Sequence, residues 1–258
     1  MMQALPSNRT DNILTNSRNL LNSSAISLLI GFAILLLIQI DRIAGISEPY
    51  IDLLTVRIIS YIVYIISIIC LFLGNLLIIL SFKSFRKIIH EKYFTGIIVN
   101  SIIMIVNCSI LLIFYFLNLI IINETSYELL EDIIFYYNLW VGPIILISCS
   151  GLFYYILDKA FTEMNNKFGV NLKIPKFYYG ILPIAPIYLL SMIIVYSVPV
   201  LNSIFVLIAI IIYSIYFLIA PATTIQLLIY IRNNYQQEFD LLSGKILSED
   251  MILNNDLK

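Results

Sequence analysis

The sequence predicts an all-α fold, a polytopic transmembrane helical bundle with six spans and both termini in the cytoplasm. Five stretches, 22 to 55 residues long, contain no charged residue, so all 15 basic and 16 acidic residues lie between or outside them. A helix needs about 20 predominantly apolar residues to cross the hydrocarbon core of a bilayer. Four stretches therefore have room for one span each, and the last has room for two. The stretches are 19–40, 58–82, 93–123, 133–157 and 177–231.

The composition points to the same class. Hydrophobic residues make up 60% of the chain and charged residues 12%, whereas about 25% charge is usual in a soluble domain. Spans and short connections use up the 258 residues, so we expect no separate soluble domain. The expected partners are the lipid bilayer and a further membrane or cytoplasmic subunit. Nucleic acid is not an expected partner.

The first three spans follow from the first three uncharged stretches. The first span, at 24–40, is expected to stay uncleaved because no A-x-A-like cleavage site follows it in residues 41–45. The second is expected at 57–81 and the third at 95–122. At about 1.5 Å per residue the third helix is longer than a 30 Å hydrocarbon core, so we expect it to tilt or to protrude.

The remaining spans come from the last two stretches. The fourth, at 133–157, has aromatic residues near both ends, which is typical of membrane interfaces. The fifth, at 177–198, and the sixth, at 203–231, share the longest stretch. They divide at Pro199, which cannot donate to a helix ladder, and Asn202 can satisfy backbone groups freed at a tight turn. Spans five and six should therefore form a close antiparallel hairpin.

The spans imply a simple domain organisation. A polar cytoplasmic segment at 1–23 precedes the six-helix domain at 24–231, and a cytoplasmic tail follows at 232–258. The tail is polar with scattered apolar residues. Two forms are open for it, a short amphipathic helix on the inner surface of the membrane or a loosely ordered segment.

The basic residues predict the orientation. With both termini inside, the inner segments hold 13 bases and the outer loops hold only Arg42 and Arg57. An excess of lysine and arginine marks cytoplasmic loops, so both termini are expected in the cytoplasm. The expected location of the protein is the plasma membrane. The inner bases are Arg9, Arg18, Lys83, Arg86, Lys87, Lys92, Lys159, Lys167, Lys173, Lys176, Arg232, Lys245 and Lys258.

Apart from Arg57, the first residue of the second span, the predicted spans contain no carboxylate, histidine or base. Proton-coupled carriers and intramembrane proteases need such groups at membrane depth, so their absence argues against both. The single histidine, His90, lies in a basic loop, and the chain has no phosphate-binding loop motif. We therefore expect a protein that is not an enzyme, with no catalytic, cofactor-binding or metal-binding residue. The three cysteines fall within spans and are expected to pack as small apolar residues.

Uncharged polar residues within the spans are the remaining candidates for function. Asn100, Asn107 and Asn118 share one face of the third span at 100° per residue, and Asn75 is placed to pair with Asn100. Two interpretations stay open. Such residues hydrogen-bond between helices, at about 0.6 kcal/mol each, or they line a cavity for an uncharged or amphipathic solute. The full set is Tyr64, Asn75, Asn100, Asn107, Asn118, Tyr216, Thr223 and Gln226.

In length, number of spans and side of the termini, the chain resembles the membrane subunits of the second class of ABC exporters. The resemblance is architectural and no motif carries it. Those subunits usually have a longer loop between the last two spans than the few residues expected here. The expected function is that of a non-enzymatic permease-type or accessory subunit acting with a partner chain. The alternative is a stand-alone facilitator or channel, lined by the polar stripes of spans two, three and six.

Overall fold

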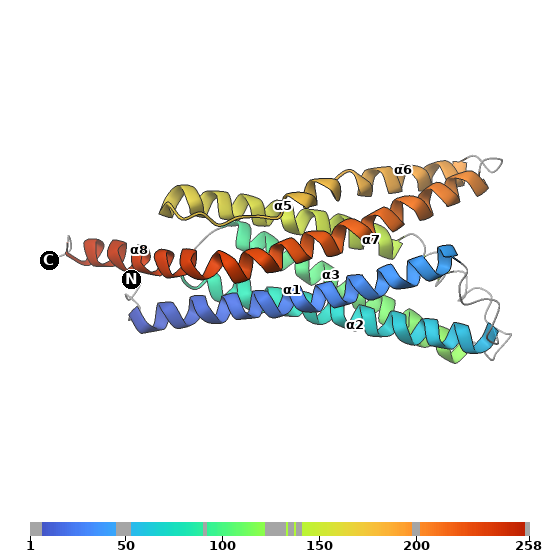
Figure 1. The fold of residues 1–258 in the computed structure, drawn as a ribbon, viewed down its shortest axis with the longest axis horizontal. Helices are drawn as coiled ribbons and strands as arrows, with labels where there is room; N and C mark the ends of the chain where they lie inside the picture. Colours follow the sequence, from blue (N-terminus) through green and yellow to red (C-terminus); the bar gives the residue numbers. More distant parts are fainter. Residues whose placement is uncertain are drawn as a thin grey trace.

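A computed structural model describes residues 7–44, 53–89, 92–121, 133, 137, 141–197 and 202–255. The described residues form helices joined by turns, with no strand among them, so the all-α prediction is confirmed for them (Figure 1). The elements are α1 (Ser7–Ala44), α2 (Leu53–Phe85), α3 (Lys92–Ile121), α5 (Gly142–Phe168), the 3-10 helix η2 (Lys176–Gly180), α6 (Ile184–Ser197), α7 (Asn202–Asn233) and α8 (Tyr235–Asn255).

Five of the described helices are long and apolar enough to cross a membrane. A sixth span is not established by these helices, because α6 has only 14 residues. At 1.5 Å per residue it is about 21 Å long, shorter than a hydrocarbon core of about 30 Å. The five candidate spans are Asp11–Ile38, Ile58–Phe85, Lys92–Leu117, Gly142–Phe168 and Ile211–Asn233.

The first helix begins much earlier than the sequence predicts. Most of the expected polar segment at 1–23 belongs to α1, which starts at Ser7 and continues without a break into the first span. The reason is a row of buried leucines at helical spacing, which extends from the first span toward the N-terminus through the polar residues. Leu14, Leu21 and Leu28 recur every seven residues and are at most 6% exposed, so the same face of the helix stays in the core.

The hairpin of α1 and α2 is closed by two reciprocal glycine–leucine contacts. A Cβ atom placed on Gly31 of α1 would lie 2.9 Å from the Leu71 side chain of α2. A Cβ atom on Gly74 of α2 would lie 2.7 Å from the Leu28 side chain of α1. Each glycine thus accepts a leucine from the other helix. Such close backbone approach is typical of small residues at membrane helix interfaces.

The fourth predicted span, at 133–157, differs at its inner end. Helix α5 continues to Phe168, eleven residues beyond the predicted end. It stops at Gly169, whose φ of 56° is the left-handed conformation that glycine adopts without a Cβ clash. The residues before Gly142 lie mostly outside the described part of the chain, and so does the predicted turn at Pro199.

The fifth predicted span, at 177–198, is broken where the sequence predicts one continuous helix. Its first part is the short helix η2, a turn follows, and α6 begins only at Ile184. Pro183 and Pro186 flank the start of α6. Proline is accepted in the first turn of a helix, because the missing N–H has no partner there, but it disrupts a helix interior. The prediction of one continuous helix over 177–198 is therefore wrong, because η2 and a turn take up its first seven residues.

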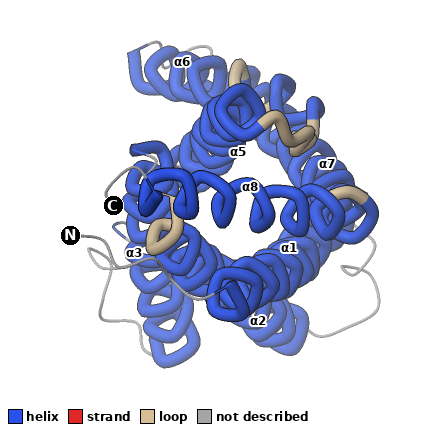
Figure 2. The backbone as a smooth tube through the Cα atoms, turned by 90° about the vertical axis from the view of Figure 1, so that its left-hand side faces the viewer, coloured by secondary structure: helices blue, strands red, loops and turns tan. Residues whose placement is uncertain are grey.

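The tail is a helix that docks onto the start of α1. Helix α7 ends at Asn233 and α8 begins two residues later, at Tyr235. Figure 1 shows α8 continuing past the end of α7, and Figure 2 shows it crossing that end of the bundle. The side chain of Ser243 on α8 hydrogen-bonds to Asp11 on α1. Of the two forms open for the tail, the structure has a helix, and it is held by the start of the chain.

Candidate functional site

Two asparagines bind α3 to α5. The side-chain amide of Asn100 donates to the backbone carbonyl of Cys149 at 2.9 Å, and that of Asn107 donates to the carbonyl of Gly142 at 3.2 Å. The donors are seven residues apart on α3, and the acceptors are seven residues apart on α5. The two bonds therefore fix the register of two antiparallel helices. Tyr137 adds a third bond, from its hydroxyl to Asn107 Oδ1 at 2.8 Å.

Hydroxyl groups join α5 to α7. Ser150 and Tyr216 lie 2.8 Å apart through their hydroxyl oxygens, and Tyr154 and Thr224 lie 3.1 Å apart. Ser150 donates its single hydrogen to the carbonyl of Leu146 at 2.7 Å, so Tyr216 is the donor to Ser150. Both tyrosines are buried. Pairing their hydroxyls removes the cost of leaving buried polar groups without partners.

The expected pair between Asn75 and Asn100 does not form. The amide of Asn75 donates to the carbonyl of Leu71, one turn back on its own helix, at 2.8 Å. The nearby carbonyl is the acceptor because it is available without any partner helix. Tyr64, predicted to share a face with Asn75, instead stacks on Tyr115 of α3 with ring centroids 5.0 Å apart.

Two of the three polar residues predicted on α7, Thr223 and Gln226, bond within their own helix. Thr223 donates to the carbonyl of Ile219 at 2.8 Å, and Gln226 donates to the hydroxyl of Tyr230 at 3.1 Å. Asn118 belongs to α3, but its side chain lies outside the described part of the structure. The seven predicted residues whose side chains are described thus make separate contacts, some between helices and some within one helix. They do not converge on one described chamber.

Some buried polar atoms among the described residues have no hydrogen-bond partner. Asn100 is 2% exposed, and although its amide donates to α5, its Oδ1 accepts no bond. A buried acceptor without a partner costs about 1–3 kcal/mol. These atoms are therefore the positions where a water or a solute donor would gain most. The atoms are Ser17 Oγ, Asn22 Oδ1, Asn100 Oδ1, Ser101 Oγ and Gln226 Oε1.

A second feature, which the sequence reasoning missed, is an aromatic cluster at the end of the bundle where α8 docks. It is made by Phe82, Phe85, Phe94, Phe161, Tyr235 and Phe239. Phe239 of α8 packs edge-on against Phe85 of α2 with centroids 5.3 Å apart, and Tyr235 packs against Phe161 of α5 at 5.5 Å. The signal in the sequence was the spacing of Tyr235, Phe239 and Leu242, which are four and three residues apart and so share one face of a helix. All three are buried.

Polar bonds fasten α8 to the connection that follows α5. The hydroxyl of Tyr235 donates to the carbonyl of Lys173 at 2.6 Å, and Lys245 donates to the carbonyl of Phe168 at the end of α5. The backbone N–H of Asn171 donates to the Glu238 carboxylate at 2.7 Å. Burial raises the pKa of Tyr235 well above its ordinary value. Its hydroxyl therefore stays protonated and remains a donor.

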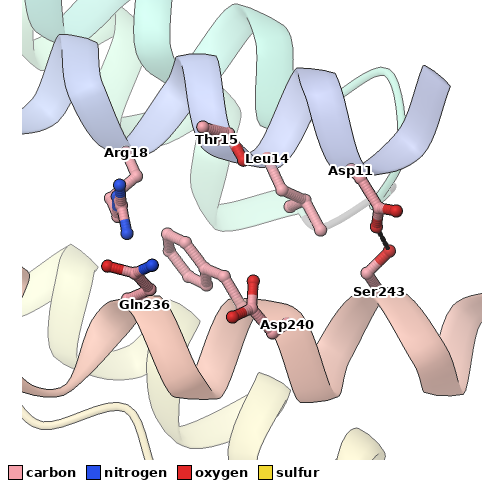
Figure 3. A pocket seen from close by; sticks show the side chains of 8 residues that line it. Asp11, Leu14, Thr15, Arg18, Gln236, Asp240 and Ser243 are labelled. Carbon is pink, nitrogen blue, oxygen red and sulfur yellow. Dashed lines mark hydrogen bonds between the residues drawn. The ribbon is translucent and has the colours of Figure 1, made fainter. Parts of the chain in front are cut away.

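A small pocket lies between α1 and α8 (Figure 3). The bond between Asp11 and Ser243 closes one side of it, and Figure 3 shows Arg18 of α1 and Gln236 of α8 pointing toward each other on the other side. Polar groups of α1 and α8 thus face each other around the apolar side chains of Leu14 and Phe239. These contacts hold α8 against α1. Its lining residues are Asp11, Leu14, Thr15, Arg18, Gln236, Phe239, Asp240 and Ser243.

Within the described residues, no group of three histidine, cysteine or acidic side chains is placed to hold a metal ion. Cys70, Cys108 and Cys149 are in the thiol form, and His90 lies outside the described part of the chain. No protein-family model, no curated protein and no solved structure matches this chain.

Proposed function

We propose that this chain is a non-enzymatic, multi-pass membrane subunit, of permease or accessory type, that acts with a partner chain. The observation that carries the proposal is the length of the bundle at the end where α8 docks. Helix α1 has 38 residues and is therefore about 57 Å long, whereas a hydrocarbon core is about 30 Å thick. The excess forms an extension with its own aromatic cluster, which offers a preformed surface outside the membrane.

The membrane placement that goes with this proposal has six crossings. The start of α1 and α8 lie at the same end, because Asp11 and Ser243 are bonded, and this supports an even number of crossings. Five long helices need one more crossing. Helix α6, at about 21 Å, and η2, at about 10 Å, together supply that length.

The charges favour a cytoplasmic location for this end, in the plasma membrane. Four exposed bases lie within three residues of a member of the aromatic cluster, each on a different helix. They are Lys83, Lys92, Lys159 and Arg232. Excess lysine and arginine next to spans is the feature that orients a membrane protein. We therefore place the start of α1, the aromatic cluster and α8 in the cytoplasm.

The hydrogen bonds within the spans favour a packing role for the polar residues. Asn107 is bonded at both its amide nitrogen and its carbonyl oxygen, and Tyr216 is bonded to Ser150. A residue whose groups are already paired has less capacity left for a passing solute. This supports a subunit that depends on a partner over a self-contained solute path.

A partner chain can be tested at the exposed face of α8. Leu241 is 55% exposed at this end of the bundle, and replacing it by aspartate leaves the buried face of α8 unchanged. We expect the full chain, extracted from its native membrane in mild detergent, to co-purify with one protein in fixed ratio. Leu241→Asp should lower that ratio about tenfold, an interface cost of about 1.4 kcal/mol.

The control is Asn166→Asp, which adds the same charge at an exposed position of α5. Thermal unfolding of both variants in detergent shows whether the fold is intact. Elution of the wild-type chain alone, with no protein in fixed ratio, contradicts the proposal.

A facilitator for an uncharged solute is the second candidate, and the unpaired Oδ1 of Asn100 is the observation that favours it. Asn100→Leu in reconstituted liposomes separates the two functions, with glycerol as the solute. A packing role predicts that neither the wild-type chain nor the variant carries glycerol faster than protein-free liposomes. It also predicts a stability loss of about 0.6 kcal/mol, and at most about 1.7. Glycerol flux that the variant abolishes would favour the facilitator.

A further inference from the structure

The line along which α3 packs against α5, called the groove below, has two exposed lysines at its base-rich end, and the ammonium group of each lies over a tyrosine ring. The ammonium of Lys92 lies 5.1 Å from the ring centroid of Tyr93, and that of Lys159 lies 5.7 Å from the ring centroid of Tyr155. Each ring restricts a side chain that would otherwise move freely in solvent. The two positive charges are therefore held near the helix surfaces.

Both lysines flank the same groove. A Cβ atom on Gly96 would lie 3.5 Å from the Ile156 side chain, so α3 and α5 touch at these residues. Lys92 comes one turn before Gly96, and Lys159 comes three residues after Ile156. Residues three or four apart share a helix face. Lys92 therefore lies on the face of α3 that meets α5, and Lys159 lies on the face of α5 that meets α3. Each is one helical turn beyond the contact, toward the base-rich end.

The acidic residues nearest to Lys159 in the sequence do not compensate its charge in the groove. The carboxylate of Asp158 accepts a hydrogen bond from the hydroxyl of Tyr178 at 3.0 Å, which directs it toward η2. Glu163 is half-buried and lies one helical turn after Lys159, closer to the C-terminal end of α5 and further from the membrane. Neither of these two carboxylates is therefore directed at Lys92 or Lys159.

Apolar side chains continue from each lysine into the membrane. Val99 and Ile103 follow Lys92 by seven and eleven residues, and Leu152 precedes Lys159 by seven, so each lies within about 20° of the line through its lysine. They are 50%, 46% and 45% exposed. A charged head site thus lies directly above two exposed apolar stripes.

We propose that this groove binds one anionic phospholipid, with its phosphate between Lys92 and Lys159 and its acyl chains along the two stripes. Charge complementarity selects the headgroup, and the apolar stripes distinguish a lipid from a free phosphate. The proposal goes beyond the function proposed above and rests only on the membrane placement given there. Each base near a membrane surface contributes about 1 kcal/mol to such binding.

Native mass spectrometry of the full chain, purified in detergent with added phosphatidylglycerol or phosphatidylcholine, tests this site. We expect one phosphatidylglycerol to be retained in preference to phosphatidylcholine. Lys92→Gln and Lys159→Gln should each weaken retention about fivefold, which is the fold-change that 1 kcal/mol gives. Excess inorganic phosphate should not displace the lipid.

The matched control is Lys83→Gln, which removes an exposed base at the same end of the bundle but on α2. It should leave phosphatidylglycerol retention unchanged, and thermal unfolding should be the same for all three variants. Equal retention of the two lipids, an equal loss in Lys83→Gln, or displacement by inorganic phosphate would each overturn the proposal. The co-purifying partner is measured in the same preparations, so failure of the lipid site is distinguishable from failure of the partner proposal.

Discussion

Gly74→Leu is expected to destabilise the protein by about 3 kcal/mol, at the upper end of the cost of overpacking a well-packed core. A Cβ atom on Gly74 would lie 2.7 Å from Cγ of Leu28 and 3.2 Å from its backbone nitrogen. The Leu28 side chain can rotate away, but the backbone cannot, so α1 and α2 must separate. Unfolding by titration with sodium dodecyl sulfate in mixed micelles measures the change in free energy.

A matched series shows whether the close approach is the cause. Gly74→Ala adds a single methyl group at the tight contact, whereas Gly96→Ala adds one at 3.5 Å from Ile156, an ordinary van der Waals distance. The first should destabilise and the second should change stability little. Leu28→Ala should restore part of the stability of Gly74→Leu, because it makes space for the new side chain. Equal effects of the two alanine variants would show that the α1–α2 seam is looser than the structure describes.

The membrane helices could be predicted because uncharged length is a one-dimensional property. The extension of α1 could not, since charges within 1–23 hide a helix whose buried face is formed by Leu14 and Leu21. The charge pattern marks where the hydrocarbon core ends, and it does not mark where the helix ends. The break in the fifth span was signalled by Pro183 and Pro186, but proline allows both a kink in a helix and its start.

The candidate site was predicted in part. Periodicity placed Asn100 and Asn107 on one face of α3, and both bind α5. Their acceptors are backbone carbonyls, which every residue has, so the sequence could not identify the partner helix. The same limit explains the wrong pairing of Asn75, whose amide donates to the carbonyl of Leu71. The aromatic cluster depends on four helices meeting at one end, and a span-by-span analysis does not contain that information.

Phe239→Ala is expected to release α8 while the spans stay folded. The Phe239 side chain is 3% exposed and lies between Phe85 and Tyr235, with centroids 5.3 Å and 5.7 Å away. Truncating a buried phenylalanine costs about 3–5 kcal/mol. Helix α8 contacts the bundle at one end only, so this loss falls on its own docking equilibrium and opens it locally.

Limited digestion with trypsin measures that opening at Lys245. In the docked state this lysine donates to the carbonyl of Phe168, which protects the bond that follows it. A docking loss of about 3 kcal/mol should raise the cleavage rate more than a hundredfold, because each 1.4 kcal/mol is a factor of ten. The control is Leu241→Ala on the exposed side of α8, which should be cleaved as slowly as the wild-type chain.

The result also decides what α8 does for the proposed function. If Phe239→Ala frees α8 and the co-purifying partner is lost while phosphatidylglycerol is retained, the partner binds the docked helix and the lipid groove is independent of it. If the partner stays bound to a chain whose tail is cleaved at Lys245, α8 is not the docking element. If Phe239→Ala is cleaved no faster than Leu241→Ala, the aromatic cluster does not hold the tail, and the extension loses its role as a rigid surface.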